Sequence, residues 1–179
     1  MAFQISRSID VLERTPPTLH AMLSGIDDFW GRANYGVETF SPFDVVGHLL
    51  EGEKHDWMVR ARLILDHGQA RAFEPFDRYA MYTTSRGKSM NDLLNEFADM
   101  RAKNLTDLRS LDLTPAALNS IGRHPALGPV TLRNLLATWV VHDLGHIHQI
   151  AKSMAFQYRN EVGPWVEYLT ILPRPSGPA

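Results

Sequence analysis

The residues with the clearest chemical potential are histidines grouped in the segment HDLGHIHQI, residues 142–150. Residues four apart on a helix lie roughly 40° around and about 6 Å along the axis from each other, so His142 and His146 can point at one ion. His148 faces away, because it lies about 200° around the helix from His146. The spacing therefore predicts a two-imidazole chelate on a helix, although a pair of ordinary core histidines fits the same spacing.

His48 is the best candidate for a third ligand. It lies in a second segment of helical periodicity, among Val45, Val46, Leu49 and Leu50. An imidazole without a partner would be costly in such apolar surroundings. Either a metal ion satisfies the ring, or His48 is a core histidine paired with a carbonyl or a carboxylate, and the sequence pattern leaves both interpretations open.

The chemistry that three histidines permit is that of an open metal site. The chain contains no cysteine, so a bound metal would be held by histidine, carboxylate or water. Three neutral imidazoles leave a divalent ion its full charge and at least one open position, which is typical of catalytic sites. Such an ion lowers the pKa of a bound water or thiol and so activates it. Zinc and nickel both suit imidazole, and the sequence does not choose between them.

Polar neighbours of the histidines are candidates for orienting them. Metal-bound imidazoles usually donate their second N–H to a carboxylate or carbonyl. The residues near the three histidines that could accept such a bond are Glu51, Glu53, Asp143 and Gln149. For Glu53, a solvent-facing position paired with Lys54 or Arg60 is at least as good an interpretation. No residue stands out as a general base.

Other residues could line or cover a cleft. His55 shares a helix face with His48 but lies roughly 10 Å along the axis, too far to share the ion. The aromatic candidates for a cleft are Trp57, Tyr79, Tyr82 and Trp139. The arginines in connections, either solvated or placed to receive an anionic substrate, are Arg78, Arg86 and Arg123. The histidines near helix ends or in loops, where solvated or capping roles are expected, are His20, His67 and His124.

The elements that would position these residues are helices, because apolar residues recur every three or four positions between stop signals. Ser41, Pro42 and Asp44 form the clearest start signal: a capping hydroxyl, a first-turn proline and a first-turn carboxylate. Thr15, before two prolines, is expected to cap a shorter helix. We expect long helices over residues 41–66, 89–111 and 131–158, and the shorter one over residues 15–25.

The remaining segments connect or extend these helices. Residues 69–88 lack periodicity and predict a long connection between the second and third helices. Short extra segments are expected over residues 6–13 and 165–172 and after the cap at Thr114 and Pro115, with a turn-rich loop at 124–129 and a Pro-rich tail at 173–179. No strand with sustained alternation is expected. The predicted fold is all-α: a four-helix bundle in a single domain spanning residues 1–179.

Composition excludes some classes of partner. The 18 Lys and Arg residues against 20 Asp and Glu give a net charge of -2, without the basic excess that nucleic acid binding requires. No apolar run approaches the roughly 20 residues that span a bilayer, and the first residues lack the apolar core of a signal peptide. We therefore expect a cytoplasmic protein that binds neither nucleic acid nor membrane.

Several motifs together resemble the DinB/YfiT-like superfamily. They are SPFDVVGHL at residues 41–49 with Glu53, HPALGPVTL at 124–132, HDLGHIHQI at 142–150 and GPW at 163–165. Each is weak alone, but their order and separation are fairly specific, and they cover nearly the whole chain. The resemblance implies a DinB-like four-helix bundle, often dimeric, with a metal triad of His48, His142 and His146.

The resemblance also implies a range of functions. Similar members include thiol-dependent transferases and isomerases that use low-molecular-weight thiols, predicted hydrolases, and proteins without an assigned reaction. We therefore expect a homodimeric metal-dependent enzyme, a transferase or hydrolase, that activates a thiol or water toward a small-molecule substrate. The alternative is a noncatalytic metal- or ligand-binding bundle with a role in stability, sensing or assembly. Catalysis requires a cleft that reaches the ion, whereas the alternative predicts a closed site.

Overall fold

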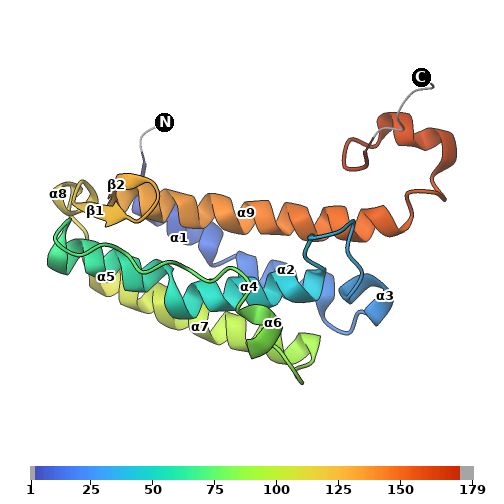
Figure 1. Ribbon diagram of the computed structural model, residues 1–179, viewed down its shortest axis with the longest axis horizontal. Helices are drawn as coiled ribbons and strands as arrows, with labels where there is room; N and C mark the ends of the chain where they lie inside the picture. The colour runs from blue at the N-terminus through green and yellow to red at the C-terminus, as the bar shows by residue number, and fades with distance from the viewer. Residues whose placement is uncertain (1–2, 174–179) are drawn as a thin grey trace.

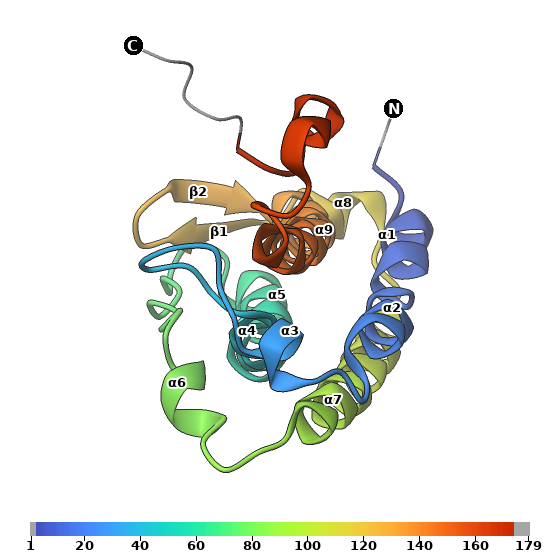
Figure 2. The same ribbon diagram turned by 90° about the vertical axis from the view of Figure 1, so that its right-hand side faces the viewer.

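The computed structural model describes residues 3–173, which form a bundle of four helical columns (Figure 1). The columns are α1 (Ile5–Leu12) with α2 (Thr15–Leu23), α4 (Pro42–His55) with α5 (Trp57–His67), α7 (Met90–Ser110), and α9 (Leu132–Gln157). Seen along the bundle, they occupy its four corners (Figure 2). The predicted four-helix bundle is confirmed.

Reciprocal hydrogen bonds start the three long columns. In the first, the Ser41 hydroxyl accepts from the Asp44 backbone N–H at 3.2 Å, and the Asp44 carboxylate accepts from the Ser41 N–H at 3.0 Å. The same capping box joins Ser89 to Asp92 and Thr131 to Asn134. Each box satisfies N–H groups that a helix end leaves open, worth about 1 kcal/mol. The predicted starts of these helices are therefore confirmed.

The predicted helix over residues 41–66 is wrong in one respect, because it is bent at Asp56. This residue has φ -119° and ψ -75°, far from the values near -63° and -42° of a regular helix, and separates α4 from α5. The hydrogen bonds from the Asp56 N–H to Gly52 and from the Arg60 N–H to Asp56 persist, at 3.0 and 2.9 Å. The bend is thus a kink between two stacked helices, with flexible Gly52 in the preceding turn.

The predicted capping role of Thr15 is also wrong. Arg14 precedes α2 in a helical conformation, with φ -84° and ψ -18°, so Thr15 is already the first residue of the helix. Its side chain is buried and donates to the Asp143 carboxylate at 2.7 Å. A tertiary contact therefore takes the hydroxyl that local sequence assigns to a cap.

The expectation that the chain has no strands is wrong, because the structure contains a short β-hairpin. Strands β1 (Ile121–His124) and β2 (Gly128–Thr131) pair antiparallel, with Ile121 opposite Thr131 and His124 opposite Gly128. Each strand has only four residues, too few for an alternating pattern to be seen. A Cβ at Gly122 would lie 2.6 Å from Ile64 Cγ1, so glycine lets the hairpin pack closely on α5.

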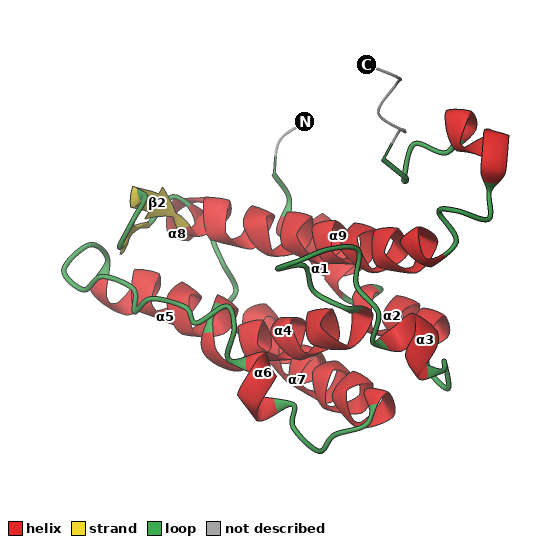
Figure 3. Cartoon of the chain, turned by 45° about the vertical axis from the view of Figure 1, so that its right-hand side comes forward, coloured by secondary structure: helices red, strands yellow, loops and turns green. Residues whose placement is uncertain are grey.

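Short elements fill the connections. They are α3 (Asp28–Gly31), α6 (Met81–Thr84) within the long connection, α8 (Pro115–Leu118) and a 3-10 helix, η1 (Gly163–Tyr168) (Figure 3). The last helix was expected two residues later, over residues 165–172. Of the predicted Pro-rich tail, residues 174–179 lie outside the described part of the chain. No helix within residues 3–173 is long and apolar enough to cross a membrane.

Two apolar clusters form the core, one toward each end of the bundle. One contains Trp57 and Trp139, and the other contains Phe97 and Ile150. Along α9, His142 and His146 lie between Trp139 and Ile150. The polar groups of the candidate site are therefore held between two packed apolar regions.

Candidate metal centre

The structure brings His48, His142 and His146 together, as the sequence analysis predicts. His48 lies in α4, and the other two lie one turn apart on α9. The Nε2 atom of His142 is 3.2 Å from Nε2 of His48 and 3.1 Å from Nε2 of His146. The same ring atom of all three histidines thus faces one point between α4 and α9.

Hydrogen bonds on the far side of two rings fix their tautomers. Nδ1 of His48 lies 3.2 Å from the backbone carbonyl of Arg78, and Nδ1 of His146 lies 2.9 Å from Oε1 of Gln149. A carbonyl oxygen only accepts, so each Nδ1 carries the proton and each Nε2 presents a lone pair. The prediction that Gln149 orients a triad histidine is confirmed. Nδ1 of His142 is buried and has no partner within residues 3–173.

Two of the Nε2–Nε2 separations match a metal site, and the possible ligand atoms of all three histidines lie within 4.8 Å of one another. Ligand nitrogens at 2.0–2.1 Å from a tetrahedral ion lie about 3.3 Å apart, close to the 3.1 and 3.2 Å measured here. Lone pairs facing one another at that distance repel unless a proton or a cation lies between them. The donor set of three imidazoles therefore fits a divalent ion such as zinc or nickel.

The environment keeps the three rings neutral, which is the form that binds metal. Burial, with a smaller effect from His146, lowers the pKa of His48 to about 4. Burial and the two neighbouring imidazoles lower the pKa of His142 to about 3. Burial also lowers the pKa of His146, against the opposing effect of its bond to Gln149. At neutral pH no proton has to be displaced from the rings before an ion can bind.

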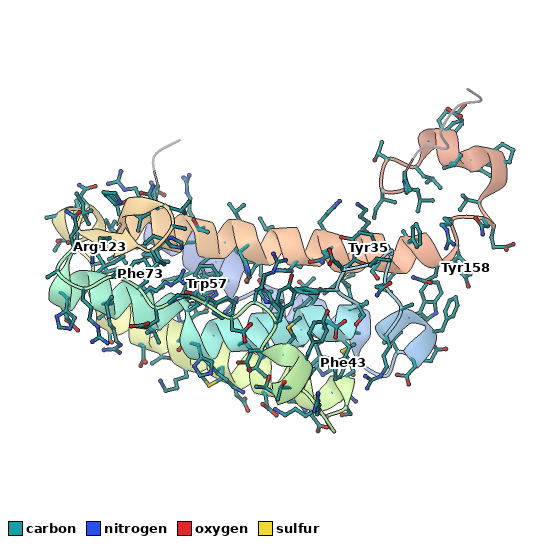
Figure 4. The ribbon with its side chains drawn as sticks, viewed as in Figure 1. Tyr35, Phe43, Trp57, Phe73, Arg123 and Tyr158 are labelled. Atoms are coloured by element: carbon teal, nitrogen blue, oxygen red, sulfur yellow. The ribbon has the colours of Figure 1, made fainter. Side chains whose placement is uncertain are left out.

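A cleft of ≈ 480 Å³ reaches the triad, and His48 and His142 form part of its wall. It runs from the triad toward the β1–β2 hairpin and is lined mostly by apolar groups. Figure 4 shows Trp57 and Phe73 between α9 and α5. The apolar lining residues are Gly52, Trp57, Phe73, Pro75, Phe76, Pro125, Ala126, Leu127, Val130 and Leu135. The site is therefore open to a small molecule.

The comparison with protein families covers most of the chain. Residues 11–150 match the model of the DinB superfamily. The chain belongs to the DinB superfamily. A solved structure, YfiT from Bacillus subtilis, superposes on it with a TM-score of 0.73 and 23% sequence identity, over 88% of this chain and 87% of that one. YfiT is described as a probable metal-dependent hydrolase with an unusual four-helix bundle topology. No curated protein matches this DinB-superfamily chain.

Two of the three carboxylates that were expected near the imidazoles of this DinB-superfamily chain bind a buried arginine instead. Glu53 and Asp143 are buried and bind Arg101, which is only 1% exposed, at 2.8 and 2.7 Å. We name Arg101, Glu53 and Asp143 the Arg101 cluster. Both interpretations of Glu53 are therefore wrong, because it contacts neither a triad imidazole nor Lys54 or Arg60. Glu51 lies 3.6 Å from His55.

The sequence analysis missed Arg101 and Asn104. Asn104 donates to both the backbone carbonyl and the carboxylate of Glu53, at 2.8 and 2.9 Å. Both residues follow the same helical spacing as Phe97 and Leu108, so they interrupt an apolar stripe. A polar residue within an apolar stripe needs a buried hydrogen-bond partner. The positions of Arg101 and Asn104 in this stripe could therefore have indicated a buried polar cluster from the sequence.

Of the residues expected to line the cleft, only Trp57 does so. Trp139 is fully buried behind it, and the two rings stack with centroids 5.7 Å apart. Tyr79 and Tyr82 are half-exposed and stack on each other at α6. The arginines expected to cover the site, Arg78, Arg86 and Arg123, are absent from its lining, although the Arg78 carbonyl orients His48.

The other histidines lie outside the triad. His148 is exposed, as its helical position predicts, and so are His20 and His67. His55 was expected to share the face of His48 and could have lined a cleft, but it is exposed and absent from the lining. His124 lies on β1 and does line the cleft. Its Nδ1 accepts the backbone N–H groups of Ala126 and Leu127, both at 3.1 Å. His124 therefore orders the hairpin turn at the far end of the cleft.

Proposed function

We propose that this chain is a metal-dependent enzyme that acts on a small molecule through an ion held by His48, His142 and His146. The observation that carries the proposal is the position of the triad at the wall of a cleft, with three Nε2 atoms converging. When bound, the ion would supply Lewis-acid chemistry that lowers the pKa of a water or a thiol. The description of YfiT as a probable metal-dependent hydrolase supports the same reading.

The chain's own residues would hold and orient the ligands and exclude bulk water. Arg78 and Gln149 keep the Nε2 lone pairs of His48 and His146 directed at the ion. The apolar wall next to His142 raises the strength of electrostatic interactions inside the cleft. Because the cleft reaches the triad, a noncatalytic bundle with a closed metal site is the weaker proposal. Zinc or nickel, a low-molecular-weight thiol as co-substrate and a homodimeric assembly remain predictions.

A turnover screen tests the proposal. The untagged protein, loaded separately with zinc and with nickel, is assayed for hydrolysis of esters and amides and for transfer of several thiols to electrophiles. We expect one of these activities to disappear on chelation, to return with the metal, and to be lost in His146→Ala. Activity that chelation leaves unchanged would contradict the proposal. Hydrolysis without thiol transfer, or the reverse, decides which nucleophile the site activates.

A further inference from the structure

A short stretch of chain runs along the cleft and contacts both of its ends. At the triad end, the ring of Phe76 packs against His48, with centroids 5.6 Å apart. At the hairpin end, the ring of Phe73 packs against His124, with centroids 6.0 Å apart. All four side chains line the cleft. Three residues of chain span at most roughly 10 Å, so the two ends are separated by about that length.

The opposite wall of the cleft gives a similar length. Its polar lining residues on α9, Asn134, Thr138 and His142, recur every four positions. The helix rises roughly 12 Å over the eight residues from Asn134, near the hairpin, to His142. The volume of ≈ 480 Å³ falls within the range of small-molecule sites. A ligand with its reactive group at the triad can therefore lie along the cleft and reach His124 with its other end.

His124 has a hydrogen-bond donor that the protein itself does not use. Its Nδ1 accepts the backbone N–H groups of Ala126 and Leu127, so the proton of the neutral ring is on Nε2. Burial and the charge of Arg60 lower the pKa of His124, which favours this neutral form. Nε2 has no hydrogen-bond partner within residues 3–173 and, unlike Nδ1 of His142, it is not buried. The donor is therefore accessible at the far end of the cleft.

The lining between the two ends favours an uncharged ligand. Its oppositely charged side chains, Asp56 and Arg60, are paired with each other at 2.5 Å. The Arg60 guanidinium also lies over the ring of Phe73, 5.2 Å from its centroid. Most of the remaining wall is apolar and includes Trp57 and Leu135. An apolar body fits this wall, and an acceptor without charge suits a neutral imidazole at its end.

We propose that the substrate is an elongated, largely apolar molecule with its reactive group at the triad and an uncharged oxygen acceptor at its other end. The acceptor is a carbonyl or hydroxyl oxygen about 10 Å from the triad, and it receives a hydrogen bond from Nε2 of His124. This inference rests on the proposed function, because it takes the triad as the reacting end. His124 is a substrate-binding residue that selects both the length and the end group of the substrate.

Hydroxamic acids that differ in length and end group test the inference without turnover, because all of them chelate zinc through the same group. Two probes are the amides of the four-carbon and eight-carbon dicarboxylic monohydroxamic acids. The others are the eight-carbon acid itself and octanohydroxamic acid, which ends in a methyl group. Calorimetric titration of the zinc-loaded protein should show the eight-carbon amide binding at least about tenfold more tightly than the four-carbon amide. It should also bind more tightly than the eight-carbon acid.

The variant His124→Asn separates the two roles of the ring. Asparagine keeps an oxygen near the position of Nδ1 for the N–H groups of the turn, but it has no donor at the position of Nε2. The variant should bind the eight-carbon amide about fivefold more weakly and octanohydroxamic acid as tightly as wild type does. His67→Asn, at an exposed histidine outside the cleft, should leave both affinities unchanged.

The possible failures are distinguishable, because zinc content per chain and circular dichroism are measured for every variant. Unchanged binding of the amide in folded His124→Asn, or an equal loss for octanohydroxamic acid, overturns the inference. If this variant does not fold, the wild-type comparisons decide. Equal affinity for the two amides, or tighter binding of the eight-carbon acid, overturns the inference even if the enzyme turns over. The expected affinities without turnover contradict only the proposed reaction, whereas a triad that binds no zinc contradicts both proposals.

Discussion

The three-histidine site and the Arg101 cluster are both buried polar groups between α4 and α9, yet they are completed in opposite ways. In the Arg101 cluster, donors meet acceptors: the guanidinium donates to Glu53, to both oxygens of Asp143 and to the Leu12 carbonyl, at 2.7–3.1 Å. In the triad, the lone pairs of His48 and His146 are directed at the same point, beside Nε2 of His142. The terminal guanidinium nitrogens of Arg101 thus find acceptors within the chain, whereas the triad could be completed by a cation.

Two adjacent residues on α9 belong to different groups, one to the triad and the other to the Arg101 cluster. His142 turns toward the triad, and Asp143 turns toward Arg101. Glu53, which follows His48 on α4, binds Arg101 as well and also accepts the Trp139 indole N–H at 3.1 Å. The Arg101 cluster thereby fixes α4 relative to α9, and so fixes His48 relative to His142. The comparison predicts that the cluster governs stability and the triad governs metal binding.

The largest expected effect is the loss of Arg101. Arg101→Met would leave two buried carboxylates without a counter-ion and should lower the free energy of unfolding by about 3–5 kcal/mol. Urea denaturation of the metal-free protein measures this. Lys103→Met is the matched control on α7, because Lys103 is exposed and its pair with Asp107 contributes at most about 1 kcal/mol. Equal losses in the two variants would contradict the assigned role of the cluster.

The second effect concerns the triad. His142→Ala removes the imidazole that contacts both of the others, and we expect zinc affinity to fall at least about 100-fold, or about 2.7 kcal/mol. Metal competition with a chromophoric chelator measures the affinity. His148→Ala, on the exposed face of the same helix, should bind zinc as wild type does. If His142→Ala still bound one zinc ion per chain with the affinity of wild type, His142 would not be a metal ligand.

Acid should destabilise the metal-free protein through the triad. The pKa of His48 is about 4 in the folded protein against 6.5 for an ordinary histidine, so between these values only the unfolded chain gains the proton. The stabilisation is fully present above pH 6.5 and is lost as the pH falls toward 4. At a pH of about 5 the loss for one such histidine is about 2 kcal/mol.

His48→Gln isolates this contribution, because glutamine does not titrate. The variant should lose about 2 kcal/mol less than wild type when the pH is lowered from about 7 to about 5. Urea midpoints measured in the presence of a chelator provide the comparison. If the two proteins show the same pH dependence, His48 does not stay neutral in the folded state.

The smallest effect is expected at the residue that orients His146. Gln149→Ala removes the acceptor for Nδ1 and should weaken zinc binding about tenfold, without removing any ligand. Gln157→Ala, also on α9 but bonded to the Ser153 and Asn34 carbonyls, is the control. An unchanged affinity in Gln149→Ala would mean that packing alone holds the ring.

The parts of the structure that the sequence predicted are those fixed by local chemistry. The starts at Ser41, Ser89 and Thr131 follow from hydrogen bonds spanning three residues, and the pairing of His142 with His146 follows from helical spacing. His48 needed the family resemblance as well, because it is distant in sequence. That the three rings meet is a tertiary fact, which the structure supplies.

The missed features depend on contacts between distant segments. The Thr15 hydroxyl was assigned to a cap, but its partner is Asp143, 128 residues away. Glu53 follows a pattern suited to a surface pair, but Arg101, 48 residues away, draws it into the core. The hairpin was missed because its stability comes from packing against α5 rather than from a long strand pattern.

The separation of His48 and His142 along the chain has one more consequence. The two residues are 94 positions apart, so an ion held by both would act as a reversible crosslink that closes a very long loop. By the chain-entropy model, a permanent link of about that span restricts the unfolded chain by roughly 4–5 kcal/mol. In a protein without cysteine, the ion would therefore do what a disulfide does elsewhere, and it would make thermal stability a direct readout of metal supply.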